Sequence, residues 1–121
     1  MTESLTIQTV QDTNFSPTLF VSTGTCFKKV AVTDIVYLKA AKDYTLIYTA
    51  TEKYLSSWGI GYLEDKLNPQ LFKRVHRSFI VNLNHVNELH REFGKTYLVM
   101  KGGVELNVGR CYGENLKQLL I

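Results

Sequence analysis

One stretch of the sequence gathers side chains that could bind a polyanion. Between Asp65 and Glu88 there is no acidic residue, and the interval contains Lys66, Lys73, Arg74, His76, Arg77 and His85. Cations that neutralise phosphates release condensed counterions, so binding to nucleic acid gains entropy. A cationic run is also typical of a solvated face that keeps a protein soluble. Charge alone therefore leaves two interpretations open, a nucleic-acid interface and an ordinary surface.

Catalytic and metal-binding patterns are weak in this sequence. It contains no glycine-rich phosphate loop, nucleophile elbow, zinc-protease motif or calcium loop. His85 and His90 fall in strand-like sequence at a spacing that alternation places on opposite faces, where they cannot share a metal ion. Cys26 and Cys111 have no CxxC partner, and we expect both to be small buried or half-buried side chains in a reducing compartment. The sequence therefore predicts no enzyme, no cofactor and no metal site.

Short strands dominate the elements that must position these residues. The chain has 121 residues and 45% hydrophobic content, which fits one domain with a single core. The apolar and polar pattern predicts strands at 18–22, 27–32, 35–40, 44–49, 53–56, 71–76, 79–83, 86–91, 96–100 and 104–108. Parallel strands need crossovers of about a dozen residues, and these connections are shorter, so the sheets are predicted to be antiparallel.

Two segments have helical spacing instead. Ile60, Leu63 and Leu67 predict a helix over 58–67, which Asn68-Pro69 ends. The second set, at the end of the chain, is Tyr112, Leu116, Leu119 and Leu120. This second set predicts an amphipathic helix about 11 residues long that packs its apolar stripe on a sheet.

The beginning of the chain differs in composition from the rest. Residues 1–17 are rich in Thr, Ser, Gln and Asn, and we interpret them as a leader or linker remnant before a domain at 18–121. Residues 1–10 lack the basic start and apolar segment of a secretory signal. Apolar runs are far shorter than the roughly 20 residues that cross a bilayer. We expect a cytoplasmic protein with no membrane contact.

The segment 72–86 carries the most specific pattern in the chain. Its string FKRVHRSFIVNLNHV resembles the core motif of the LytTR DNA-binding domain, found in bacterial response regulators of the LytR/AgrA type. Other segments similar to that family are residues 34–38, Asp43-Tyr44, residues 63–67, residues 104–108, Arg110 and Tyr112. Lys39 stands where the family usually has an acidic residue, and Gly109 where it usually has Ser. We expect the second departure to cost little, because Gly caps a helix almost as well as Ser.

The resemblance, which covers roughly 18–120, implies both a fold and a function. The fold is mainly β, an elongated arrangement of short antiparallel sheets with one short internal helix and a C-terminal helix. The function is sequence-specific binding of double-stranded DNA by a bacterial transcription regulator, through loops around Tyr44, Arg77 and Arg110. The expected partners are DNA with repeated half-sites, bound by two copies, and a receiver domain or sensor kinase pathway upstream, as in two-component systems. The alternatives are a β-rich RNA-binding module, which needs exposed aromatics on a sheet face, and a protein-interaction module.

The DNA-binding residues that we expect on this basis are Lys42, Tyr44, Lys73, His76, Arg77, Ser78 and Arg110. Arg77 is the first choice for reading the O6 and N7 acceptors of guanine, with a salt bridge or a phosphate clamp as the alternative. Arg110 either faces a phosphate or base edge or is a solvated cap residue. Tyr44 either offers its hydroxyl to a base, while Lys42 meets the backbone, or is an ordinary cross-strand aromatic.

The remaining candidates flank Arg77. For His76 we predict a hydrogen bond that fixes the loop, with a phosphate contact as the second choice. Ser78 either donates to a phosphate or closes a turn on the backbone. Strict alternation places Arg74 on the face of His76 and Lys73 on that of Arg77, so only one of the pair Lys73 and Arg74 is expected to face the DNA.

Overall fold

The computed structural model describes residues 15–121, so most of the leader predicted at 1–17 lies outside the described residues. The strands are β1 (Thr18–Ser22), β2 (Phe27–Ala31), β3 (Ile35–Ala41), β4 (Tyr44–Thr49), β5 (Lys53–Ser56), β6 (Phe72–His76), β7 (Phe79–Asn82), β8 (Val86–Glu92), β9 (Lys95–Met100) and β10 (Glu105–Asn107). Every strand pairs antiparallel to its neighbours. The predicted mainly β, antiparallel fold is therefore confirmed.

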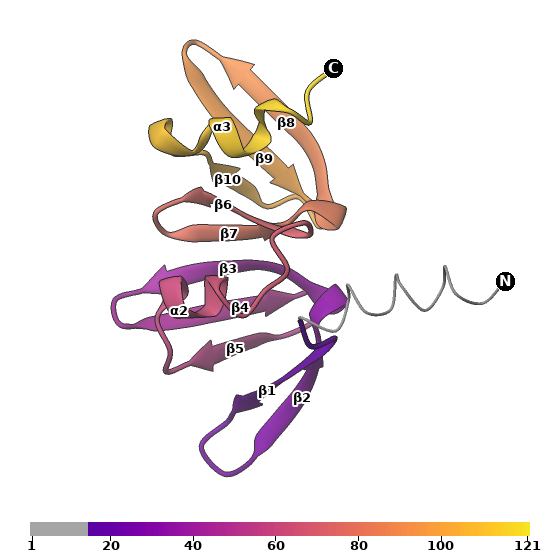
Figure 1. The fold of residues 1–121 in the computed structure, drawn as a ribbon, viewed down its shortest axis with the longest axis vertical. Coiled ribbons are helices and arrows are strands. Elements are labelled where there is room, and N and C mark those ends of the chain that lie inside the picture. The colour runs from indigo at the N-terminus through magenta and orange to yellow at the C-terminus, as the bar shows by residue number, and fades with distance from the viewer. Residues whose placement is uncertain (1–14) are drawn as a thin grey trace, which may run out of the picture.

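The strands form three sheets that follow one another along the long axis of an elongated molecule (Figure 1). The hairpin β1-β2 lies at one end, and a sheet of order β10-β9-β8 lies at the other. Between them is a five-stranded sheet of order β5-β4-β3-β7-β6. Since β3 pairs with both β4 and β7, the turns β3–β4 and β6–β7 emerge at the same end of this central sheet.

Both faces of the central sheet are buried, because its strands alternate between two hydrophobic clusters. Leu38 of β3 and Ile80 of β7 belong to the cluster that includes helix α2 (Ile60–Glu64) and the β1-β2 hairpin. The adjacent residues Tyr37 and Val81 point to the other face and belong to a cluster with Leu98, Met100, Leu106 and Leu116. The sequence predicted a single core, whereas the central sheet divides the apolar interior into two.

Stacked aromatic rings support the strands that lead to the β3–β4 and β6–β7 turns. Tyr37 of β3 stacks on Tyr48 of β4 with ring centroids 4.4 Å apart, and it meets the edge of Phe79 of β7. Burial, with a smaller electrostatic effect of Tyr48, raises the pKa of Tyr37 to about 12. The Tyr37 hydroxyl therefore stays protonated well above neutral pH.

Both helices are shorter than predicted. Helix α2 covers Ile60–Glu64 rather than 58–67, although Leu67 is buried in the turn that follows. The C-terminal segment is a 3₁₀ turn, η3 (Arg110–Tyr112), followed by α3 (Glu114–Lys117), instead of a continuous helix. Gly113 separates these two elements, and glycine has a low helix propensity.

The apolar stripe predicted for the C-terminal helix is only partly buried. Leu116 is 4% exposed, whereas Leu119 and Leu120 are 50% and 40% exposed. Because Lys117 ends α3, the later leucines no longer follow the helical spacing on which the prediction relied. None of the helices among residues 15–121 is long and apolar enough to span a membrane.

The prediction for the cysteines was wrong. Cys26 and Cys111 are both exposed and unpaired with each other. Cys26 lies in the β1–β2 turn, where its backbone carbonyl accepts hydrogen bonds from the Thr23 N–H and hydroxyl, and Cys111 lies in η3. Both cysteines lie in tight turns on the surface. A small side chain fits such a turn, whereas burial of an apolar side chain does not explain either position.

Candidate nucleic-acid interface

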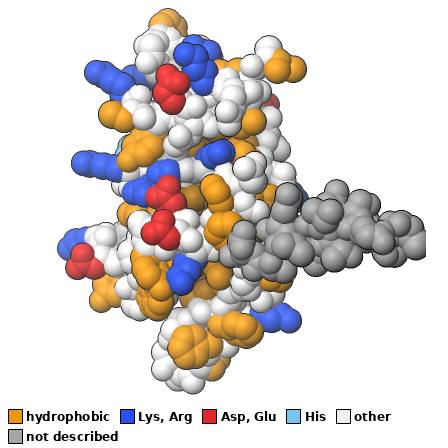
Figure 2. All heavy atoms as spheres, viewed as in Figure 1, with side chains coloured by type: hydrophobic (Ala, Val, Ile, Leu, Met, Phe, Trp, Pro, Cys, Tyr) orange, Lys and Arg blue, Asp and Glu red, His pale blue; other side chains and the backbone are white. Residues whose placement is uncertain are grey.

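Three segments that are distant in sequence meet at one edge of the molecule. They are the β3–β4 turn at residues 42–43, the β6–β7 turn at residues 77–78 and the start of η3 at residues 109–110. All three lie on the left side of Figure 1, and Figure 2 shows Lys and Arg side chains projecting from that side. The Ala40 N–H donates to the Ser78 carbonyl at 2.8 Å, and the Gly109 N–H donates to the Val75 carbonyl at 2.7 Å. Backbone hydrogen bonds therefore hold the three segments in register.

The β6–β7 turn is shaped by His76. Its Nδ1 accepts a hydrogen bond from the Ser78 N–H at 3.0 Å, which is the loop-fixing contact predicted from the sequence. The imidazole also lies 5.3 Å from the Phe79 ring, centroid to centroid. With the turn closed in this way, Arg77 is left exposed at its tip.

Arg74 braces the same turn from the other side of the strand. Its Nη1 forms an ion pair with Glu64 Oε1 at 2.7 Å, its Nε donates to the His76 carbonyl at 3.0 Å, and its Nη2 donates to the Arg77 carbonyl at 2.5 Å. The Arg74 side chain is only 17% exposed. Its charge is therefore used by contacts with the turn and with α2, whereas Arg77 forms no ion pair within residues 15–121.

The predicted alternation along β6 was wrong at its end. The register shifts between Arg74 and His76, so that Arg74 pairs with Ile80 and His76 with Phe79. Such a bulge adds one residue to the strand and resets which face each following side chain points to. Arg74 consequently reaches α2 on one face, whereas His76 packs on the opposite face beside Phe79 and Gly109.

Lys73 lies within β6 rather than in the turn. It pairs with Val81 and is half-buried at the edge of the central sheet. The structure thus separates Lys73 from Arg77 by the bulge and does not place both on the turn.

The β3–β4 turn presents Lys42 and Tyr44. Lys42 is exposed and has a left-handed backbone, with φ of 59°. Tyr44 is 49% exposed and pairs across the hairpin with Ala41. Within residues 15–121 no other ring packs on Tyr44, so the interpretation as a cross-strand aromatic has no partner ring to support it.

The third segment approaches the β6–β7 turn closely at Gly109. A Cβ at this position would lie 2.9 Å from Tyr112 Cδ2 and 3.5 Å from two atoms of His76. The sequence-based view that replacing Ser by Gly here is nearly neutral was therefore incomplete, because a Cβ at this position requires the Tyr112 ring to shift. Arg110 follows directly and is exposed.

Two residues that position the interface, and one residue beside it, were missed from the sequence. Glu64 of α2 holds Arg74, and Asn115 of α3 donates from Nδ2 to the Arg74 carbonyl at 2.7 Å. Both lie far from residue 74 in sequence, and no local pattern indicates these contacts. Lys95 is also missed. Lys95 is the first residue of β9 and lines a polar hollow of about 510 Å³ together with Arg110 and Asn107, and its position directly after Gly94 was the only available signal.

No group of three or more His, Cys, Asp and Glu side chains within residues 15–121 is arranged to hold a metal ion. His90 instead stacks on Tyr97 and contacts Glu88 at 2.8 Å. His85 bonds through Nε2 to the Thr33 carbonyl at 2.8 Å. The two histidines predicted not to share a metal thus have separate partners.

Comparison with known proteins gives a consistent result. A family model described as the LytTr DNA-binding domain matches residues 26–121. The chain is 41% identical over 92 residues to the sensory transduction protein LytT of Bacillus anthracis, an alignment that covers 75% of this chain and 37% of the relative. It is 31% identical over 105 residues to the transcriptional regulatory protein LytR of Staphylococcus aureus, covering 86% of this chain and 43% of the relative.

A solved structure of a LytTr DNA-binding domain from Bacillus cereus has the same fold. The TM-score is 0.78 at 24% sequence identity, and the match covers 86% of this chain and 96% of that one. The chain spans about two fifths of the length of the longer relatives named above.

Proposed function

The chain belongs to the LytTr DNA-binding domain family, and from that premise we propose that it binds double-stranded DNA sequence-specifically as part of a bacterial transcription regulator. The observation that carries the proposal is the edge at which three distant segments meet. Each segment brings an exposed side chain able to contact nucleic acid, namely Lys42 and Tyr44, Arg77, and Arg110. An interface of loops held by a β scaffold suits the part of the chain that the structure describes, in which both α-helices are short.

The proposed contacts divide into base reading and phosphate binding. Arg77 at the tip of its turn reads guanine, since a guanidinium can donate two hydrogen bonds to O6 and N7 in the major groove. Lys42, Lys73 and Arg110 neutralise phosphates, and such contacts set position without reading sequence. Tyr44 offers its hydroxyl to a base from the neighbouring turn.

His76 and Ser78 have supporting places in this proposal. The Nδ1 atom of His76 is occupied by the Ser78 N–H, so His76 positions the turn, and Nε2 is the atom left for a phosphate. The Ser78 hydroxyl is the second phosphate donor, beside Arg77. Both contacts are weaker candidates than Arg77, because both side chains are half-buried.

The proposed assembly on DNA contains two copies. A domain of this size covers only part of a regulatory site, and two copies on repeated half-sites enlarge the sequence that is read. We expect little or no dimer in free solution. In the same proposal, residues 1–17 are a leader or linker remnant, a receiver domain or sensor kinase pathway supplies the signal, and the protein acts in the cytoplasm.

A selection experiment tests the proposed function. The full chain is incubated with a pool of random duplexes at physiological salt, and the retained DNA is sequenced. The expected result is one enriched motif that occurs as two half-sites on the same duplex. Recovery of no enriched motif overturns sequence-specific binding, and efficient competition by single-stranded RNA would favour the RNA-binding alternative instead.

A further inference from the structure

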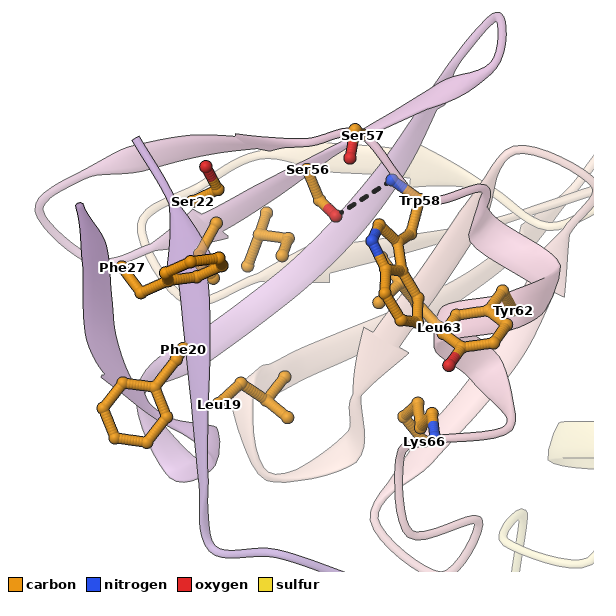
Figure 3. Close-up of a pocket in the computed structure, with 12 residues that line it drawn as sticks. Leu19, Phe20, Ser22, Phe27, Ser56, Ser57, Trp58, Tyr62, Leu63 and Lys66 are labelled. Carbon is orange, nitrogen blue, oxygen red and sulfur yellow. Dashed lines mark hydrogen bonds between the residues drawn. The ribbon is translucent and has the colours of Figure 1, made fainter. Parts of the chain in front are cut away.

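An apolar groove lies between the β1-β2 hairpin and the segment that leads from β5 into α2 (Figure 3). Its volume is about 240 Å³. The floor is made of core side chains, including Ile47 and Leu63. Four aromatic residues line the groove, Trp58 and Tyr62 on the α2 side and Phe20 and Phe27 on the hairpin, where Leu19 points toward Tyr62 and Phe20 points away from it. None of these wall residues has a part in the proposed DNA contacts.

The aromatic walls are exposed to an unusual degree. Phe20 and Phe27 on the hairpin are 63% and 70% exposed, and Trp58 and Tyr62 on the opposite side are 48% and 43% exposed. Single exposed apolar residues are ordinary, but a contiguous group around a hollow is typical of a binding site. The groove therefore presents apolar surface that the rest of the described chain does not cover.

The wall on the α2 side is held in place by hydrogen bonds. The Thr45 hydroxyl donates to the Trp58 carbonyl at 2.8 Å, and the Trp58 N–H donates to Ser56 Oγ at 3.2 Å. The indole then packs against the Tyr62 ring, with centroids 3.9 Å apart. Because the wall is formed in advance, a ligand loses less of its binding energy to ordering it.

One cation stands at the rim of the groove. Lys66 Nζ lies 5.1 Å from the centroid of the Tyr62 ring. Among residues 15–121 no carboxylate forms an ion pair with Lys66. At the other end of the groove, Ser56 accepts the bond from Trp58 and so keeps its own hydroxyl hydrogen free to donate.

We propose that this groove binds a small amphipathic carboxylate. Its apolar body lies between the Trp58 and Tyr62 rings on one side and Leu19 and Phe27 on the other, and its negatively charged head is recognised by Lys66. The charge of Lys66 selects an anion, while the apolar floor excludes a ligand that is polar throughout. A volume of about 240 Å³ equals roughly eight water-sized volumes of about 30 Å³, which suits a ligand of about ten non-hydrogen atoms.

Octanoate is the probe, and the chain reports its binding directly. Trp58 is the only tryptophan in the sequence, so the intrinsic tryptophan fluorescence of the full chain monitors this wall alone. The expected result is a saturable change with octanoate below its micelle concentration, and weaker binding of octanol and octylamine. No saturable change, or equal binding of the three compounds, overturns the proposal.

Two variants test separately how the groove recognises the charged head and the apolar body of the ligand. Lys66→Gln is expected to weaken octanoate about two- to fivefold, as for an exposed ion pair, and to leave octanol unchanged. Phe27→Ser is expected to weaken both compounds. The matched control Lys101→Gln, on a turn outside the groove, is expected to change neither. Octanoate binding that is unaffected by Lys66→Gln overturns the proposal even if Phe27→Ser fails to fold, and DNA binding by wild type reports on the proposed function separately.

Discussion

Two arginines, three positions apart in sequence, have opposite surroundings at the proposed interface. Arg74 contacts Glu64 and two backbone carbonyls, whereas Arg77 is exposed at the tip of the turn. The sequence alone does not distinguish them, because the partners of Arg74 come from α2 and from a bulge that breaks strand alternation. Which arginine is structural follows from tertiary contacts.

The first prediction separates these two roles by stability. Arg74→Ala should lower the free energy of unfolding by about 1–3 kcal/mol, because it leaves turn carbonyls and Glu64 without their donor. Arg77→Ala is the matched control, with an expected change of about 0.5 kcal/mol or less, since the side chain is exposed. Urea unfolding of both variants measures the difference. Equal stability of the two would contradict the bracing role of Arg74.

The second prediction concerns the close approach at Gly109. Gly109→Ala places a Cβ 2.9 Å from Tyr112 and should destabilise the domain by about 1–3 kcal/mol through overpacking. Gly113→Ala is the control, since nothing lies within 4 Å of its Cβ position and its φ is −60°. Thermal melting compares the two. A Gly109→Ala variant as stable as Gly113→Ala would show that Tyr112 moves aside at little cost.

At the level of elements, strands were predictable and helices were less so. Each predicted strand ends within one residue of the observed one, because alternation and turn residues are local signals. The C-terminal helix was overestimated because apolar spacing at 112, 116, 119 and 120 is also compatible with a 3₁₀ turn and a short helix. The length of a helix depends on which of its residues pack against another part of the protein. Of the three leucines, only Leu116 is fully buried.

The third prediction tests this view of the C-terminal segment. Leu116→Ala should lower the free energy of unfolding by about 2–4 kcal/mol, because Leu116 is buried in the hydrophobic cluster that contains Leu98 and Leu106. Deleting residues 119–121 should lower the free energy of unfolding much less, since these side chains are largely exposed. Denaturant unfolding of both variants provides the comparison. A deletion as costly as Leu116→Ala would indicate that the end of the chain packs more tightly than described.

For the whole molecule, the arrangement of charge matters more than its total. The formal net charge is only +3, yet the turns that carry the exposed residues Lys42, Arg77 and Arg110 lie at one edge of the molecule and come from segments distant in sequence. The family resemblance predicts contacts from the loops that carry these residues, and that prediction is still to be tested. The hydrogen bonds that bring the loops together, such as Gly109 to Val75, depend on the complete fold and could not be predicted locally.

The fourth prediction follows from this arrangement. If Lys42, Lys73 and Arg110 neutralise three phosphates while Arg77 contacts a base, log affinity of one copy should fall with log salt at a slope of about −2.7. Lys42→Gln should reduce the slope by about 0.9, because one fewer counterion is released. Lys101→Gln is the control. The backbone N–H of Lys101 donates to the His85 carbonyl, so Lys101 lies at the end of β7 opposite to the one that Arg77 precedes. Affinity that is flat between low and physiological salt would exclude a phosphate-dominated interface.

The central claim is that the edge formed by the three segments reads DNA sequence and that Arg77 is its reading residue. The most direct measurement is the affinity of wild type, Arg77→Ala and Lys42→Ala for a selected duplex and for a scrambled duplex, with melting curves to show that each variant is folded. We predict that Arg77→Ala loses about 1–3 kcal/mol on the selected duplex and much less on the scrambled one, while Lys42→Ala loses affinity about equally on both. Equal losses for Arg77→Ala on the two duplexes would contradict the claim and make Arg77 a phosphate clamp.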